Sequence, residues 1–493
     1  MTTQRPTLRW SLPMGTDGAV VDICRRRECM AADIVDTVTV MASSARPSAA
    51  LSAGTYFWRV RARVGGMTAA RSSTTWMFIV PAHDSAVDST SGFVGDYNGD
   101  GFADLVVGAP QARSTRGAVF VYYGGAMGLP ATTSLAIEGL EANEAFATAS
   151  VSVGGDINGD GYSDLIVSSR NNTYVFNGSA TGLASSPSAF FAGSSVGYGA
   201  GDLDRDGYGD ALVARPMADA MMVRGAGTVS FHRGSSSGLV MVATRDLNGS
   251  AINEEFGGRA AAIGDVNGDG YSDVAIASTN ARPSGLTGAG QARVYLGGAM
   301  GLAATPSWTS NGSAEFQNFG SSIGGGDVTG DGYSDVVVGA PASTTGRVFL
   351  FTGSAGGPSA TPTTTWVGDA NGENFGSTLG CGDTDRDGFA DVLVGAPEAA
   401  PMSSGFARLF RGSAAPATSA ARGYVGAAAT RLGLAVTVIG DTNGDGFDDI
   451  AVSSAEGAGI VRTHVGSAAS VGVAVNRMYS GEAASAFGTR LGQ

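Results

Sequence analysis

Short apolar runs, separated by segments rich in Gly and Asp, cover most of this chain of 493 residues. One such run, Leu105-Val106-Val107, follows a loop of acidic and small residues, and a similar loop and run occur seven times. Short runs of β-branched apolar residues bounded by turn-forming residues predict buried β-strands. Helical periodicity is nearly absent. The pattern therefore predicts an all-β fold built from repeats.

Each repeat contains four strand-like apolar runs. In the fifth repeat they are residues 319–326, 335–339, 347–351 and 363–367. Four short strands per unit, repeated many times, are typical of a β-propeller in which each unit forms one blade. We therefore predict a seven-bladed β-propeller with four-stranded blades over residues 92–493.

The first repeat lacks an apolar strand before its Asp-rich loop, whereas the chain carries a spare one at residues 486–493. We expect this C-terminal strand to fill the missing inner position of the first blade, because ring closure removes unpaired strand edges. The alternative is a truncated eighth repeat, which would leave Phe487 and Leu491 exposed.

Residues 1–82 contain no repeat. Apolar side chains alternate with mostly cationic ones over residues 56–63, so one face of this segment is apolar. Such alternation predicts a strand of a small β-sandwich over residues 1–82. The polar residues 83–91 read as a linker. Cys24 and Cys29 either close a small disulfide loop or remain free thiols.

The seven loops share the pattern D-x-[DNT]-x-D-G-[FY]-x-D. Oxygen-bearing side chains at positions 1, 3, 5 and 9 can converge on one point, and the Gly at position 6 permits the sharp turn. Hard cations such as Ca²⁺ bind about six to eight oxygens, often including a backbone carbonyl. We therefore predict up to seven Ca²⁺ ions, one per loop. Position 7 is expected to supply its carbonyl, with its aromatic ring turned into the core.

The predicted metal ligands occupy positions 1, 3, 5 and 9 of each loop. They are Asp96, Asn98, Asp100 and Asp104; Asp156, Asn158, Asp160 and Asp164; Asp202, Asp204, Asp206 and Asp210; Asp265, Asn267, Asp269 and Asp273; Asp327, Thr329, Asp331 and Asp335; Asp383, Asp385, Asp387 and Asp391; and Asp441, Asn443, Asp445 and Asp449.

An EF-hand loop begins in the same way but needs an acidic residue at position 12. Position 12 is apolar in all seven loops, as at Val107 and Ile276. The helix–loop–helix reading is therefore excluded. A tight Asp- and Gly-rich turn that holds no metal remains the alternative to a calcium site.

Two further motifs accompany the loops. The apolar run ends in Gly-Ala-Pro at residues 108–110, 339–341 and 395–397, and a Phe-Gly pair precedes three loops, at 256–257, 319–320 and 375–376. Residues 92–493 thus resemble the FG-GAP repeats of the integrin alpha-chain β-propeller, although several copies lack one of the two motifs. The segment around residues 51–63 resembles a strand of a fibronectin type III domain.

The resemblance implies a calcium-binding propeller of the cell-adhesion type, outside the cell or at its surface. It implies a protein or glycan ligand at the propeller face opposite the metal loops. Residues 1–6 are not followed by the apolar stretch of a secretory signal. Either the protein stays in the cytoplasm, or the N-terminus is truncated or its start missed. Because calcium sites suit the calcium-rich exterior of the cell, we expect a truncated N-terminus or a missed start.

The formal net charge is −14, and more than half of the 44 acidic residues lie in the seven loops. Seven divalent cations would neutralise that formal charge. No basic stripe interleaved with aromatic residues occurs, which argues against a nucleic-acid partner. No apolar run approaches the roughly 20 residues of a membrane span.

The sequence shows no catalytic constellation, so we predict a binding protein and not an enzyme. A polysaccharide lyase, or another carbohydrate-active enzyme, is the alternative. It would need Arg, Tyr and a His or Lys around a groove. A third possibility is a structural spacer at the cell surface with no specific ligand.

Overall fold

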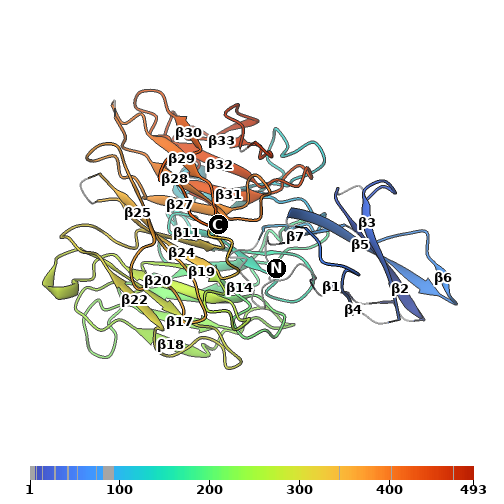
Figure 1. Ribbon diagram of the computed structural model, residues 1–493. Coiled ribbons are helices and arrows are strands. Elements are labelled where there is room, and N and C mark those ends of the chain that lie inside the picture. Colours follow the sequence, from blue (N-terminus) through green and yellow to red (C-terminus); the bar gives the residue numbers. More distant parts are fainter. Residues whose placement is uncertain are drawn as a thin grey trace.

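The computed structural model contains a small group of β-sheets near the N-terminus and a larger ring of sheets (Figure 1). It describes residues 6, 8–10, 12–13, 15–26, 29–41, 44–52, 54–73, 75–80, 94–342, 345–400, 402–469 and 471–492. The linker predicted at residues 83–91 lies outside these ranges. Within them, the only helical turns are α1 (Ala112–Thr115) and η1 (Pro283–Gly285). The prediction of an all-β fold is confirmed.

Seven four-stranded antiparallel sheets are found in the described part of the chain after residue 94. The first combines β8 (Leu105–Ala109), β9 (Ala118–Tyr122) and β10 (Leu135–Glu138) with β35 (Arg490–Leu491). The second to fourth are β11 (Ser150–Gly155), β12 (Asp164–Ser168), β13 (Thr173–Phe176) and β14 (Ala189–Phe191); β15 (Val196–Gly201), β16 (Asp210–Arg215), β17 (Thr228–His232) and β18 (Arg245–Asn248); and β19 (Arg259–Gly264), β20 (Asp273–Ser278), β21 (Gln291–Tyr295) and β22 (Trp308–Asn311). The last three are β23 (Ser322–Gly326), β24 (Asp335–Ala340), β25 (Arg347–Phe351) and β26 (Thr364–Val367); β27 (Thr378–Gly382), β28 (Asp391–Ala396), β29 (Phe406–Phe410) and β30 (Arg422–Val425); and β31 (Val436–Gly440), β32 (Asp449–Ser454), β33 (Ile460–His464) and β34 (Arg477–Ser480).

The first strands of successive sheets form the inner wall of a ring. Each contacts the next, from β11 through β15, β19, β23 and β27 to β31, and β35 contacts β11. Thr437 Oγ1 on β31 donates to the carbonyl of Gly492, directly after β35, at 3.1 Å. All of these strands line one central channel. This arrangement of radial four-stranded sheets around a channel is a β-propeller.

The C-terminal strand β35 is the inner strand of the first sheet. It pairs with β8, with Arg490 opposite Gly108 and Leu491 opposite Val107. Phe487, just before β35, is 1% exposed, and its ring centroid lies 5.6 Å from that of Phe120. Residues from both ends of the propeller sequence therefore share one sheet and one apolar core.

The Phe-Gly and Gly-Ala-Pro motifs lie where neighbouring sheets meet. Phe375 is fully buried and packs against the rings of Phe406 and Phe410. A Cβ added to Gly339 would lie 2.1 Å from the carbonyl oxygen of Gly376 in the next sheet. Only a residue without a side chain allows this approach, so the motif residues set how closely adjacent sheets pack.

The N-terminal region combines a five-stranded sheet with a two-stranded one around one main apolar core, and Cys24, Cys29 and Phe57 form a smaller buried cluster. The larger sheet contains β2 (Gly18–Cys24), β3 (Ile34–Val40), β5 (Gly54–Val64), β6 (Met67–Thr68) and β7 (Trp76–Val80), and the smaller pairs β1 (Leu8–Arg9) with β4 (Ser44–Ala45). Cys24 and Cys29 form a disulfide. Figure 1 shows these strands beside the propeller. Arg386 Nη2, in the sixth Asp-rich loop, donates to the carbonyl of Arg25 at 3.4 Å, so this region lies on the side of the loops.

Candidate metal sites

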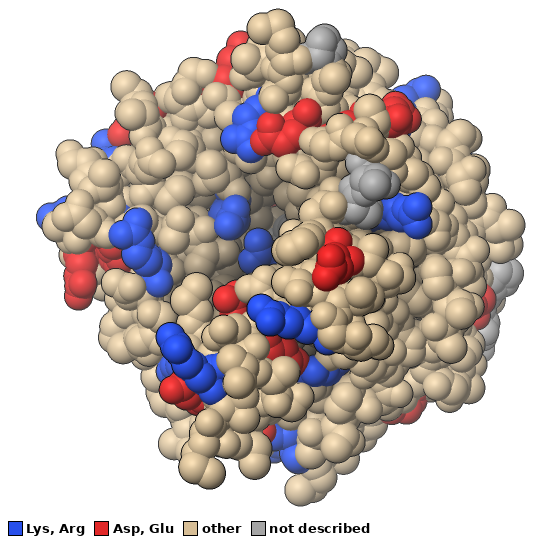
Figure 2. Space-filling view, turned by 90° about the vertical axis from the view of Figure 1, so that its left-hand side faces the viewer, with Lys and Arg blue, Asp and Glu red and all other residues tan. Residues whose placement is uncertain are grey.

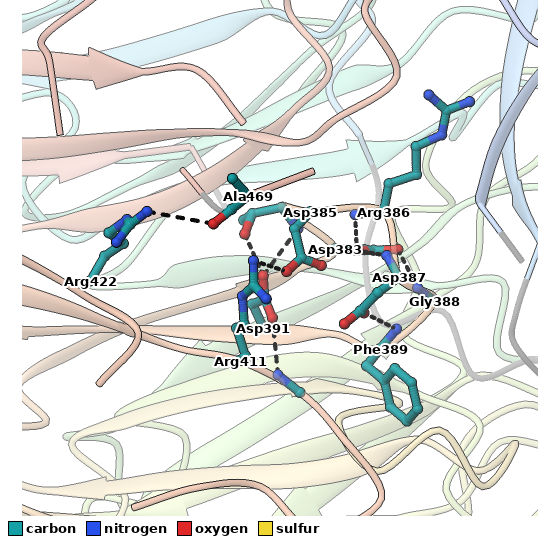
Figure 3. Close-up of polar contacts among 12 residues, drawn as sticks. Asp383, Asp385, Arg386, Asp387, Gly388, Phe389, Asp391, Arg411, Arg422 and Ala469 are labelled. Carbon is teal, nitrogen blue, oxygen red and sulfur yellow. Dashed lines mark hydrogen bonds and ion pairs between the residues drawn. The ribbon is translucent and has the colours of Figure 1, made fainter. Parts of the chain in front are cut away.

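The second to seventh Asp-rich loops each join the inner strand of a sheet to the next strand, and the first loop directly precedes β8. In all seven loops the Asp at position 9 fastens the loop to its sheet. In the sixth loop, the Oδ1 atom of Asp391 accepts a hydrogen bond from Gly412 N at 2.9 Å, and Oδ2 accepts one from Thr384 N at 3.3 Å (Figure 3). The corresponding Asp accepts two backbone N–H bonds in every loop. One carboxylate thus ties its loop to the end of the third strand.

The carboxylates at positions 1 and 5 accept backbone hydrogen bonds that close the rest of the loop into a tight turn. Asp383 Oδ2 accepts from Gly388 N at 3.0 Å, and Asp387 Oδ1 accepts from Phe389 N at 3.0 Å. Both bonds recur in all seven loops. The four predicted ligands of each loop are therefore gathered on one tight turn.

The third and sixth loops bring three carboxylates especially close. One oxygen each from Asp383, Asp385 and Asp387 lies within 4.8 Å of the others, and the same holds for the third loop's Asp202, Asp204 and Asp210. Asp204 Oδ1 and Asp385 Oδ1 are buried and have no hydrogen-bond partner among the described residues. Buried anionic oxygens without a donor are costly, and a hard cation would satisfy them. The donor set therefore fits a calcium ion.

These two loops also carry a feature that the sequence reading missed. They are the loops with Asp at position 3, and each such Asp pairs with an Arg at the end of the third strand. Arg233 lies 2.7 Å from Asp204, and Arg411 lies 2.7 Å from Asp385. The other loops have Asn or Thr at position 3 and a neutral residue in place of the Arg. The Arg offsets the additional carboxylate, and its co-occurrence with that Asp was a signal available in the sequence.

The fifth loop has Thr329 in place of Asn or Asp. Its hydroxyl donates to Asp335 Oδ1 at 3.4 Å, and its backbone N–H donates to Oδ2 at 2.9 Å. A neutral hydroxyl that is engaged with the closing carboxylate is a poorer calcium ligand than a carboxylate. We expect this loop to be among the weaker sites.

Neighbouring loops are joined to one another. Ser163 N, at position 8 of the second loop, donates to the carbonyl of Asp96, at position 1 of the first, at 3.0 Å. At position 8 of the seventh loop stands a buried acid, Asp448, whose Oδ2 accepts from Asp383 N in the sixth loop at 3.1 Å. The sequence reading missed Asp448, because position 8 is Ala, Ser or Gly elsewhere. Loss of order in one loop therefore disturbs the next.

The aromatic residue at position 7 is half-buried between loops, so the expectation that it turns into the core is wrong. A Cβ on Gly99, at position 4 of the first loop, would lie 2.5 Å from the Tyr162 ring of the second. Position 4 has a left-handed backbone in these loops, with φ of 66° at Gly99 and 64° at Arg386. Where Arg replaces Gly, its guanidinium covers the next ring, as Arg386 covers Phe447 at 5.5 Å. The ring thus packs loop against loop.

Burial shifts the acidity of the loop carboxylates. It raises the pKa of Asp164 to about 7 and of Asp335 and Asp391 to about 8, and neighbouring loop carboxylates raise these values as well. The backbone N–H bonds act in the opposite direction. Without a cation the charged form is disfavoured, whereas a bound divalent cation would favour it.

A pH dependence follows. The pKa of these carboxyls in the folded protein lies above the unfolded value of about 4. In calcium-depleted protein, their contribution to stability is therefore fully present below pH 4 and is lost as the pH rises through about 7 to 8. Calcium competes with these protons, so the increase in Tm on adding Ca²⁺ should be larger at pH 8 than at pH 6. Equal increases at both values in thermal melts of resin-depleted protein would contradict this.

Comparison with protein families finds the FG-GAP repeat at residues 90–122, 257–295, 319–351 and 375–407. The FG-GAP-like repeat matches residues 156–213. Integrin alpha-V of Gallus gallus is 30% identical over 268 residues, which cover 53% of this chain and 21% of the integrin. Integrin alpha-IIb of Mus musculus is 32% identical over 146 residues, which cover 28% of this chain and 14% of the integrin. These relatives are thus matched over about a fifth of their length or less.

Comparison with solved structures finds, among others, two that are rhamnogalacturonan lyases by their titles. Rhamnogalacturonan lyase YesW aligns with 96% of this chain and 75% of its own, at 13% identity and a TM-score of 0.38. Rhamnogalacturonan lyase PL11 of Bacillus licheniformis aligns with 95% of this chain over 73% of its own, at 11% identity and a TM-score of 0.34. These likenesses are too distant to bear on activity. Among the described residues, no helix has the length and apolar character needed to cross a membrane.

Proposed function

The chain is an FG-GAP repeat protein similar in sequence to integrin alpha chains, and on this basis we propose that it is a calcium-stabilised recognition module of the adhesion type. The observation that carries the proposal is the repeated curling of three or four carboxylates into one loop, with buried, unpartnered oxygens at Asp204 and Asp385. Calcium would be structural, because it would order loops that are hydrogen-bonded to the loops of neighbouring sheets. Calcium is abundant outside the cell, so an extracellular or cell-surface location suits such sites.

We place the ligand, a protein or a glycan, at the face opposite the metal loops. The connections between second and third strands gather there, and residues 215–227 form a long one. It exposes Met217, Met221 and Met222, the last two at 79% and 101%. Met side chains are flexible and polarizable, which suits contact with a partner surface. Loops carried on a rigid ring of sheets commonly supply binding residues.

Replacing Asp335 with Ala tests the calcium proposal at one loop. The substitution removes the closing carboxylate and leaves Gly353 N without its acceptor. We expect calorimetric titration with Ca²⁺ to show one bound ion fewer, and the free energy of unfolding to fall by about 1–3 kcal/mol even without calcium. Asp369→Ala is the matched control, since Asp369 pairs with Arg408 away from the loops. An unchanged ion count in Asp335→Ala would contradict the assignment.

A polysaccharide lyase is the second candidate. The observation that favours it is that Tyr198, Arg259 and Arg490 all line the central channel. The described lining includes no His, and the chain has no Lys. Incubating the calcium-loaded protein with acidic polysaccharides and following unsaturated products by ultraviolet absorbance separates the two candidates. Product formation would favour the lyase.

A further inference from the structure

The central channel contains a cavity with both polar and apolar lining, and Asp104 of the first metal loop is the one acidic residue in its described wall. Its volume is about 260 Å³, and it is lined by the inner strands of the propeller. Figure 2 shows the face that points away from the N-terminal strands, with a hollow at its centre and cationic side chains inside the hollow. Both arginines of the lining begin an inner strand, Arg259 in β19 and Arg490 in β35. The fourth metal loop follows the other end of β19, and the other end of β35 points toward the start of β8, directly after the first metal loop. This hollow therefore lies on the face opposite the metal loops.

Backbone carbonyls hold the two guanidinium groups in place. Arg259 Nε donates to the carbonyl of Ser321 at 3.2 Å, and its Nη1 donates to that of Gly258 at 2.9 Å. Arg490 Nε donates to the carbonyl of Ala149 at 3.2 Å. Neither arginine forms an ion pair with any acidic residue that the structure describes. The pair is thus fixed and uncompensated, whereas Arg233 and Arg411 each have a carboxylate partner.

Two cations that share a cavity repel each other, and the effect is visible on Arg490. Burial and the charge of Arg259 lower the pKa of Arg490 to about 10. Like charges in a partly desolvated site are unfavourable unless an anion lies between them. The protein therefore maintains an arrangement that a bound anion would stabilise.

Unpartnered hydroxyls in the same cavity point independently to a ligand. Ser377 Oγ and Thr489 Oγ1 are buried atoms with no hydrogen-bond partner among the described residues, and both residues line the cavity. Buried polar atoms of folded proteins are nearly always satisfied by protein or water. The guanidinium groups would donate charge-assisted bonds to an oxyanion in the cavity, and these hydroxyls are further unused donors in its wall.

We infer that the channel mouth binds the oxyanion of an acidic sugar, such as the carboxylate of a uronic acid residue or a sulfate ester. The inference rests on the proposed recognition function and names the chemical class of its ligand. Ligand pockets for larger molecules usually have about 300–1,000 Å³, so this smaller cavity suits a single acidic sugar unit at the end or side of a glycan. Its narrow, hydroxyl-lined wall favours a sugar over a folded protein surface.

The test uses the calcium-loaded full chain and calorimetric titration with sodium glucuronate, sodium sulfate and glucose. We expect glucuronate and sulfate to bind and to compete with each other, and glucose not to bind. Arg490→Gln and Arg259→Gln should each weaken glucuronate binding about tenfold or more, as expected for a lost charge-assisted bond. Arg408→Gln, at an arginine already paired with Asp369, is the matched control and should bind as the wild type does.

Thermal melting shows whether a variant that binds glucuronate weakly is still folded. Arg490→Gln relieves the repulsion from Arg259, so its Tm should equal or exceed that of the wild type. Glucuronate binding that neither arginine variant weakens, or no binding by calcium-stabilised protein, would overturn the inference and leave the calcium proposal standing. Binding of an acidic peptide in preference to glucuronate would overturn the assignment to a glycan. Absence of calcium stabilisation is a separate result, and it would count against the proposed function.

Discussion

Deleting residues 482–493 is expected to leave a protein that does not fold into a stable, soluble propeller. The deletion removes β35, the inner strand of the first sheet, together with buried Phe487 and Leu491. Loss of a buried Phe alone costs about 3–5 kcal/mol, and whole domains are stable by only about 5–15 kcal/mol. The deletion also exposes the edge of β8, and unpaired strand edges promote aggregation.

Two point variants test the contribution of a single buried side chain to this closure. Phe487→Ala keeps the strand but empties its core position beside Phe120, and should lower the free energy of unfolding by about 3–5 kcal/mol. Met478→Ala, at a side chain 58% exposed in β34, should change it by less than about 0.5 kcal/mol. Denaturant unfolding measures both. Wild-type melting and solubility of the deletion variant would show that β35 does not close the ring.

Removing calcium with excess chelator is the change with the second largest expected effect. Each ion that binds only the folded protein adds about 2.7 kcal/mol when calcium is a hundred times its Kd. Two such sites should therefore raise Tm by roughly 10–20 °C, since about 2–4 °C correspond to one kcal/mol in a medium-sized protein. The hydrogen bonds between neighbouring loops, such as Asp448 Oδ2 with Asp383 N, should spread the loss over several sheets.

Magnesium is the control for this experiment. Mg²⁺ demands near-octahedral geometry and gives up its water reluctantly, so it should restore Tm less than Ca²⁺ at the same concentration. Arg411→Gln offers a second comparison, because it leaves Asp385 with an uncompensated charge. Its melting temperature should depend more strongly on calcium than that of the wild type. A melting curve that excess chelator leaves unchanged would argue for Asp- and Gly-rich turns without metal.

Much of the fold could be predicted because each repeat encodes its strands locally. The run expected at residues 347–351 is β25, and that expected at 335–339 is β24 with one more residue. The inner strand was expected from Phe319, but β23 begins at Ser322. Phe319 instead forms a bridge with Gly290 and fills a core between sheets. A side chain that belongs to packing between sheets reads in the sequence like part of a strand.

The candidate metal loops could likewise be predicted, since all four positions fall within nine residues. The residues that contact these loops from other parts of the chain could not be predicted. Arg411 reaches Asp385 from another strand, and Asp448 reaches Asp383 from another loop. The meeting of Arg259 and Arg490 depends on closure of the whole ring. Contacts that span a sheet or the channel depend on how the blades are arranged, and one sequence without related sequences carries little trace of them.

Counting bound calcium tests the central proposal most directly. Purified protein depleted of metal is dialysed to equilibrium against micromolar to millimolar Ca²⁺, and bound ions per chain are determined by elemental analysis. We predict saturable binding of several ions, up to seven, with one fewer in Asp335→Ala and no change in Asp369→Ala. Binding of no calcium above that of an unrelated acidic protein of similar charge would contradict the proposal that these loops are calcium sites.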